Sequence, residues 1–175
     1  MPASAFIIHV SEAERLVGRL RLKYDPTAAL GVPAHVTILF PFMSPERITP
    51  NVVHAAAEAF AVVPSFEFIL NEVRRWPKTT YLAPEPEQPF IQLTKAVTQA
   101  FPEYPPYAGE HPEIVPHLTV AHGDVQAAET AEGELRAALQ SSGPIRGFCR
   151  EVELIENSSG AWRTMHVIAL QRRDA

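Results

Sequence analysis

Short apolar runs alternate with helix-like patterns in the first part of the chain. Residues 5–10 are mostly apolar, which predicts a buried strand. Ser11, with Glu14 three residues later, is a capping-box pattern and predicts a helix over residues 12–22. A loop then leads to a second apolar strand, which ends at Pro41. The opening of the chain is therefore predicted to be strand, helix, strand.

The middle of the chain predicts a helix followed by a hairpin. Thr49 followed by Pro50 suits the N-cap and first turn of a second helix. Residues 66–70 and 79–83 have the composition of strands. We expect these two strands to pair, with residues 74–78 at the exposed tip between them.

The second half of the chain follows the first loosely. Residues 89–101 and 125–140 predict helices, and a proline-rich loop over residues 102–116 leads to a further strand between them. Residues 145–155 and 162–170 predict two strands joined by a turn. Strands interleaved with helices and ending in hairpins favour an α+β fold with largely antiparallel sheets.

One short pattern occurs twice, slightly less than half the chain apart. His35 and Thr37 follow one proline, and His117 and Thr119 follow another, with an apolar residue inside each His-x-Thr motif. Positions i and i+2 of a strand share a face, so each histidine points the same way as its threonine. The repeat predicts a single domain over residues 1–175, made of two pseudo-symmetric lobes that each present one such pair.

Composition and charge limit the classes of partner. Of the 175 residues, 46% are hydrophobic and 20% are charged, which is ordinary for a domain with a real core. The net charge of −5 argues against an extended RNA or DNA surface, although a small phosphate-bearing ligand needs only a few donors. The sequence has no signal-peptide pattern and no stretch near the ~20 apolar residues of a membrane span. We expect a cytoplasmic monomer without membrane contact.

Two histidines that face each other can serve as general base and general acid at a phosphorus atom. Imidazole titrates near neutral pH, so one ring can remove a proton from the attacking group while the other protonates the leaving oxygen. A threonine hydroxyl beside each ring can donate to a non-bridging phosphate oxygen. This arrangement requires no metal. Because the sequence has one cysteine, Cys149, and neither a P-loop nor a His/Cys metal pattern, we expect no cofactor.

The paired motif resembles that of the 2H phosphoesterase superfamily, and more narrowly that of the bacterial 2′-5′ RNA ligase-like proteins. The matching segments are His35-Val36-Thr37-Ile38 and His117-Leu118-Thr119-Val120, with similar flanking residues at 31–34, 39–42 and 81–86. The resemblance implies two α+β lobes whose sheets form a V-shaped central groove. It also implies cleavage of cyclic phosphodiesters such as RNA 2′,3′-cyclic phosphate ends, and in some members ATP-independent joining of RNA through a 2′-5′ bond.

Carried over by motif, His35 and His117 are the acid–base pair, and Thr37 and Thr119 are the phosphate donors. Which histidine is the acid stays open. Trp76 and Tyr81 could stack on a nucleobase or could equally pack at a hairpin. We expect structural or surface roles for the remaining candidates, which are Arg74, Arg75 and Lys78 at the hairpin tip, and His9, His54, His111, His122 and His166.

The resemblance leaves three functions to distinguish. The first is a metal-independent phosphoesterase acting on a cyclic phosphate nucleotide or RNA terminus, with reversible 2′-5′ ligase activity as an extension. The second is a binding module that holds a nucleotide or RNA end without turnover. The third keeps the enzyme but gives it linear oligonucleotide ends as substrate.

Overall fold

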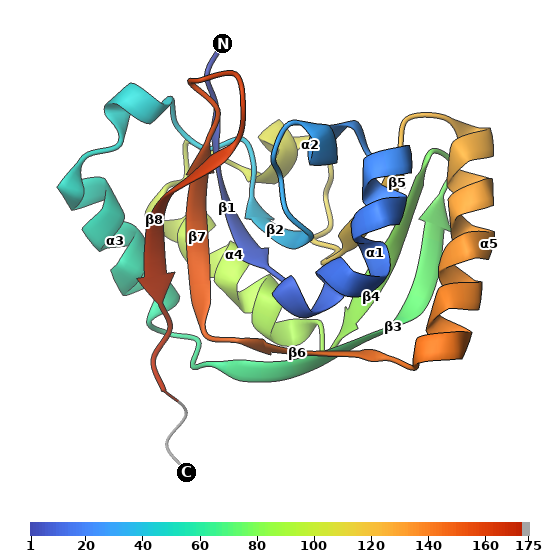
Figure 1. The fold of residues 1–175 in the computed structure, drawn as a ribbon. Coiled ribbons are helices and arrows are strands. Elements are labelled where there is room, and N and C mark those ends of the chain that lie inside the picture. The colour runs from blue at the N-terminus through green and yellow to red at the C-terminus, as the bar shows by residue number, and fades with distance from the viewer. Residues whose placement is uncertain (173–175) are drawn as a thin grey trace.

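The computed structural model describes residues 1–172, and these form one eight-stranded sheet (Figure 1). The strand order is β6-β3-β4-β5-β2-β1-β7-β8, and neighbouring strands in it are antiparallel. The strands are β1 (Ser4–His9), β2 (His35–Leu39), β3 (Phe66–Trp76), β4 (Thr79–Glu85), β5 (Leu118–His122), β6 (Ile145–Cys149), β7 (Glu151–Glu156) and β8 (Arg163–Ala169).

The sheet consists of two similar four-stranded halves that meet at its centre. One half has the order β2-β1-β7-β8 and the other has the order β5-β4-β3-β6. Strand β2, which begins at His35, is therefore the neighbour of β5, which begins directly after His117. A single residue pair, Val36 and Leu118, joins β2 to β5. The predicted α+β fold with two pseudo-symmetric, antiparallel lobes is confirmed.

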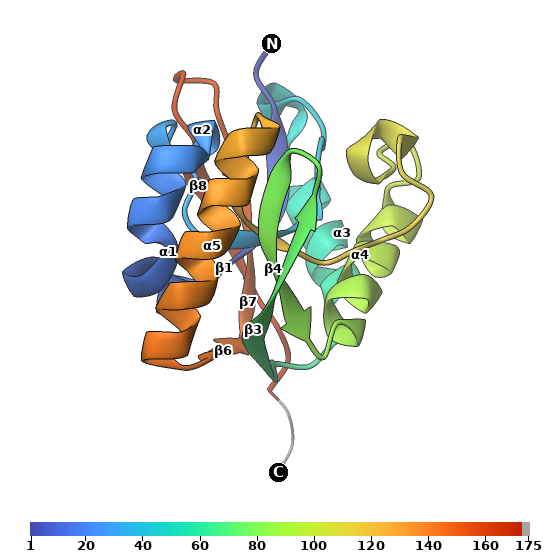
Figure 2. The same ribbon diagram turned by 90° about the vertical axis from the view of Figure 1, so that its right-hand side faces the viewer.

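Helices cover the sheet in two groups. They are α1 (Ser11–Tyr24), α2 (Pro26–Ala29), α3 (Pro50–Phe60), α4 (Gln88–Ala100) and α5 (Val125–Ser142), with 3₁₀ helices η1 (Pro45–Arg47) and η2 (Pro106–Gly109). Figure 2 shows α1 and α5 on one side of the sheet strands and α3 and α4 on the other. Helix α1 packs against β5, and α4 packs against β2, so each covers the central strand of the opposite half. These helix contacts hold the two halves together, although few backbone hydrogen bonds join β2 to β5.

The two predicted helix starts have different outcomes. Thr49 caps α3 as predicted, because its hydroxyl accepts from the Val52 amide. The capping box at the first helix was wrong: α1 begins after Val10 without a side-chain cap. Glu14 instead accepts the Ala34 amide at 2.6 Å. A partner 20 residues away therefore takes the carboxylate that the local pattern assigned to the helix start.

Two strand predictions need correction because strand patterns do not specify partners. Residues 145–155 are not one strand, since β6 pairs with β3 whereas β7 pairs with β1 and β8, on either side of Arg150. The chain passes there from one half of the sheet to the other. The predicted hairpin tip at 74–78 was also too long, because β3 runs on to Trp76 and pairs with β4 up to Thr79.

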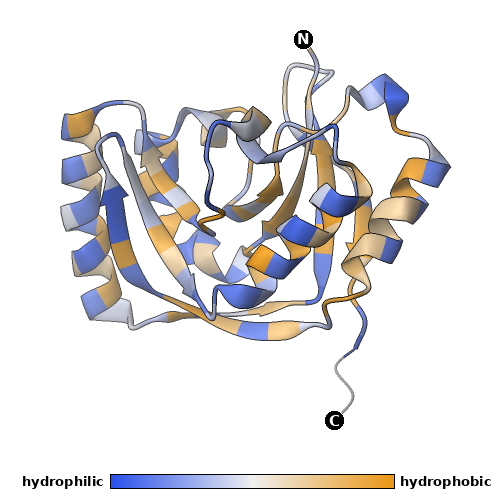
Figure 3. Cartoon of the chain, turned by 180° about the vertical axis from the view of Figure 1, so that it is seen from behind, coloured by the Kyte–Doolittle hydropathy of each residue, from blue (hydrophilic) through white to orange (hydrophobic). Residues whose placement is uncertain are grey.

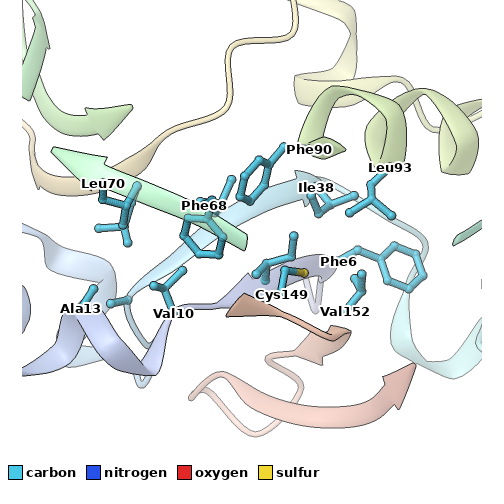
Figure 4. Close-up of a cluster of buried hydrophobic side chains, with 14 of the residues drawn as sticks. Phe6, Val10, Ala13, Ile38, Phe68, Leu70, Phe90, Leu93, Cys149 and Val152 are labelled. Carbon is cyan, nitrogen blue, oxygen red and sulfur yellow. The ribbon is translucent and has the colours of Figure 1, made fainter. Parts of the chain in front are cut away.

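One apolar cluster fills the space between the sheet and the helices. Figure 4 shows side chains from both halves within it, including Phe6, Phe68 and Phe90. Val36 and Leu118, the apolar residues inside the two His-x-Thr motifs, are fully buried in the same cluster.

Burial raises the pKa of the Cys149 thiol to about 12, so this cysteine is a packing residue. Polar and apolar residues alternate along the helices, as expected for elements with one face on a core (Figure 3).

Candidate active site

The two histidines make the same hydrogen bond to the backbone. His35 Nδ1 lies 2.7 Å from the Pro33 carbonyl oxygen, and His117 Nδ1 lies 2.7 Å from the Val115 carbonyl oxygen. A carbonyl only accepts hydrogen bonds, so Nδ1 of each ring carries a proton. In the neutral ring, Nε2 is then the basic atom. The same hydrogen bond, made two residues back along the chain, therefore gives both histidines the same tautomer.

The register between β2 and β5 brings the two motifs together in opposite directions. Val36 pairs with Leu118. Extending that antiparallel register by one residue places position 35 across from 119, and position 37 across from 117. Each histidine is therefore expected to lie opposite the threonine of the other motif. The charge of His117 also contributes to lowering the pKa of His35, as expected for neighbouring groups.

Burial lowers the pKa of both imidazoles. It lowers the pKa of His35 to about 4, and the positive charge of Arg21 adds to this effect while the hydrogen bond to Pro33 opposes it. The pKa of His117 is also lowered, again mainly by burial. Both rings are therefore neutral near pH 7 and can accept a proton at Nε2. A phosphate anion bound beside either ring would favour its charged form and raise its pKa.

Aromatic rings surround His117. The ring of Trp76 lies edge-on to His117 at 5.0 Å between centroids, and Tyr81 lies at 5.5 Å. Trp76 is 39% exposed whereas Tyr81 is buried. The two aromatic residues singled out from the sequence thus lie beside the second histidine, with 4.2 Å between their own ring centroids.

Tyr107, in the proline-rich loop over residues 102–116, is a further aromatic residue at this site. The sequence left open whether this loop lines the site or only crosses the surface. The Tyr107 ring stacks against His117 at 6.4 Å between centroids, and its hydroxyl lies close enough to the Thr37 side chain to lower the pKa of the phenol, against the larger effect of burial. Its amide donates to the Phe40 carbonyl at 2.6 Å, and its φ of 50° lies in the left-handed region. The hydrogen bond to Phe40 places this loop next to the first motif.

Charged groups on helix α1 hold the turn before His35. Arg21 donates from Nη1 to the Val32 carbonyl and from Nη2 to Asp25, both at 2.9 Å. The Arg21 and Asp25 side chains are each only 2% exposed. The bond from the Ala34 amide to Glu14 holds the same turn from the other side. Helix α1 thereby fixes the backbone on which His35 stands.

The arginines of the hairpin point in opposite directions. Arg75 pairs with Glu132 on α5, so it faces the helical side. Arg74 pairs with Glu72 and lies close enough to Tyr81 to lower the pKa of its phenol, against the larger effect of burial. Of these two arginines, Arg74 is the one that lies on the aromatic side of the sheet.

The remaining groups show no metal-binding arrangement. Within residues 1–172, no three or more His, Cys, Asp or Glu side chains are placed so that they could hold a metal ion. Over the same range no helix is long and apolar enough to span a membrane.

Comparison with known proteins identifies one family over most of the chain. The model of the 2′-5′ RNA ligase superfamily matches residues 9–161, which include both His-x-Thr motifs. No curated protein matches the chain in a direct sequence search.

Solved structures share the fold at low sequence identity. Escherichia coli LigT, solved with 3′-AMP, is 17% identical, with 98% of this chain and 99% of that chain covered and a TM-score of 0.60. The Thermus thermophilus protein TT0787 is 16% identical, with 98% and 100% covered and a TM-score of 0.61. A protein described as a phosphoesterase is 17% identical, with 97% and 98% covered and a TM-score of 0.61.

Proposed function

The chain belongs to the 2′-5′ RNA ligase superfamily, and from that premise we propose that it is a metal-independent phosphoesterase that hydrolyses 2′,3′-cyclic phosphates of nucleotides or RNA ends. Family and fold support an enzyme of the phosphoesterase or RNA ligase-like type. The observation that carries the finer proposal is the matched bonding of His35 and His117, which leaves Nε2 of both rings as the basic atom.

The reaction uses one ring as base and the other as acid. Nε2 of one neutral histidine takes a proton from water, the water oxygen bonds to phosphorus, and the bond from phosphorus to a ribose oxygen breaks. The other histidine, protonated beside the bound phosphate anion, gives its proton to that oxygen. Thr37 and Thr119 donate to the non-bridging oxygens, where charge develops. In the reverse direction the two histidines exchange their acid and base roles. When a 5′-hydroxyl attacks the cyclic phosphate in place of water, the product contains a 2′-5′ bond.

A nucleotide substrate is supported by two further observations. LigT structures are described as complexes with 3′-AMP, NADP⁺, ATP and phosphate, and LigT shares this fold. In this chain, Trp76 is partly exposed beside His117, where its ring can stack on a base.

The test is hydrolysis of nucleoside 2′,3′-cyclic phosphates in the presence of EDTA. We expect turnover by the wild type, and a loss of about 100-fold or more in kcat in both His35→Ala and His117→Ala, as for removal of an acid–base group. His54→Ala is the matched control, because the His54 side chain is 76% exposed on α3. Absence of turnover with tight nucleotide binding unaffected by either substitution would overturn the proposal in favour of a binding module.

A further inference from the structure

A cleft lies in the His35 half of the molecule, away from the aromatic cluster at His117. Its volume is about 290 Å³, and it is lined by His9, Gly31, Pro33, Glu153, Ile155, Trp162, Arg163 and Thr164. Pro33 supplies the carbonyl that holds His35. His9 is the direct cross-strand partner of His35 between β1 and β2, and directly opposed residues share a face. The cleft therefore adjoins the proposed catalytic histidine.

The floor of this cleft is apolar and separate from the main core. Ile7, Val32 and Ile155 form a small buried cluster with Ala5, and the Trp162 side chain packs against it. The backbone of Trp162 is fixed by a hydrogen bond from its amide to the Leu30 carbonyl. A flat ring could lie on Trp162 over this floor, since base–aromatic stacking accepts any nucleobase.

The polar wall of the cleft suits a hydrogen-bond donor rather than an anion. Glu153 is 12% exposed, with Oε2 accepting from Thr164 at 2.7 Å and Oε1 3.5 Å from His9 Nδ1. A second carboxylate, Glu14, lies 3.8 Å from the same imidazole. Two carboxylates against one imidazole disfavour a phosphate and favour hydroxyl or amino donors.

The cation at the edge of the cleft is already paired. Arg163 hydrogen-bonds to Glu156, whose side chain is 2% exposed. Hydrogen bonds from Ser158 and Arg163 lower the pKa of Glu156 to about 2, so the carboxylate stays ionised and retains its partner. Because Arg163 is paired with Glu156, the side chains of Glu153 and His9 determine which ligand groups the cleft favours.

We propose that this cleft is a subsite for an uncharged nucleoside, with its base on Trp162 and a hydroxyl or amino group on Glu153. The inference rests on the proposed function and deepens it, because the reacting phosphate then lies between two nucleoside subsites. Trp76, supported by Tyr81, would hold the nucleoside that carries the cyclic phosphate, and the cleft would hold the nucleoside with a 5′-hydroxyl. The substrate that fills both is a 2′-5′-linked dinucleoside monophosphate.

Cleavage of that substrate balances without water or a co-reactant. The 3′-hydroxyl of the first ribose loses its proton to one histidine, and its oxygen bonds to phosphorus. The bond from phosphorus to O5′ breaks, and His35, beside the cleft, gives a proton to O5′. The products are a nucleoside 2′,3′-cyclic phosphate and a free nucleoside, and ligation is the reverse.

The experiment compares substrates that fill one subsite or both. The readout is the ratio of kcat/KM for a 2′-5′-linked diadenosine monophosphate to kcat/KM for adenosine 2′,3′-cyclic phosphate. We expect Trp162→Ala and the isosteric Glu153→Gln to lower this ratio by about 10-fold or more, as for loss of a stacking contact. Trp76→Ala, the matched change in the other half, should lower both kcat/KM values. A ratio unchanged in both cleft variants would overturn the subsite.

A binding measurement separates failure of the subsite from failure of the proposed catalysis. Trp76 and Trp162 are the two tryptophans of the sequence, so the Trp76→Phe protein reports on the cleft by fluorescence. Adenosine should quench this signal saturably, and Glu153→Gln should weaken the quenching by about 10-fold. Adenosine binding without turnover of either substrate would support the subsite and refute the catalytic proposal. Displacement of adenosine by inorganic phosphate, or no quenching at all, would overturn the subsite.

Discussion

The two His-x-Thr motifs share one bonding scheme but lie in different surroundings. His35 and His117 each hydrogen-bond through Nδ1 to a carbonyl two residues back. The first stands on a turn fixed by Arg21 and Glu14, whereas the second lies among the rings of Trp76, Tyr81 and Tyr107. The shared part sets the tautomer and hence the chemistry. The different parts set how firmly each ring is held and what lies beside it.

The largest effect should come from removing the buried ion pair between Arg21 and Asp25, which lies next to the turn before His35. Arg21→Met leaves the Asp25 carboxylate buried without its partner, and removing one member of a buried ion pair costs about 3–5 kcal/mol. We expect the free energy of unfolding, measured in urea, to fall by that amount. Arg19→Met on the exposed side of α1 is the control and should change little. Equally small changes in the free energy of unfolding of both variants would show that the ion pair between Arg21 and Asp25 does not stabilise the protein.

An intermediate effect should come from the aromatic half. Trp76→Ala removes the partly exposed ring beside His117 and should raise KM for nucleoside 2′,3′-cyclic phosphates by about 10-fold, through lost base stacking. Trp76→Phe keeps an aromatic face and should retain most of the affinity. Steady-state kinetics of the two variants would decide the point. An unchanged KM in Trp76→Ala would contradict the proposed contact between Trp76 and the base of the substrate.

A third effect, which develops gradually, should appear in the pH dependence of stability. The pKa of His35 is about 4 in the folded protein and near 6.5 when unfolded, so the unfolded chain binds more protons between these values. The free energy of unfolding should therefore decrease as the pH falls from 6.5 towards 4, with this contribution fully present above pH 6.5.

Substitution of either histidine tests that dependence. His35→Gln and His117→Gln should each reduce the loss of stability over this pH range, because burial lowers the pKa of both imidazoles in the folded protein. Urea unfolding at a series of pH values measures both slopes. A slope unaffected by His35→Gln would contradict the lowered pKa of His35 in the folded protein.

The sequence by itself determined the elements and the repeated chemistry. Alternating apolar residues predicted the two central strands, and the Thr49 cap fixed the start of α3, because each depends on neighbours within a few residues. The His-x-Thr spacing likewise predicts which side chains share a face. The catalytic roles of His35, His117, Thr37 and Thr119 remain predictions that the kinetic experiments test.

Only the tertiary structure decided the partners of these elements. Glu14 holds Ala34 rather than the helix start, the Tyr107 amide bonds to the Phe40 carbonyl, and β1 places His9 across from His35. Nothing in the local pattern distinguishes Arg21, a buried cation, from a surface arginine on the same helix. These contacts join residues far apart in the chain, so they depend on the path of the whole backbone and on competition among partners. Local periodicity carries no information about either.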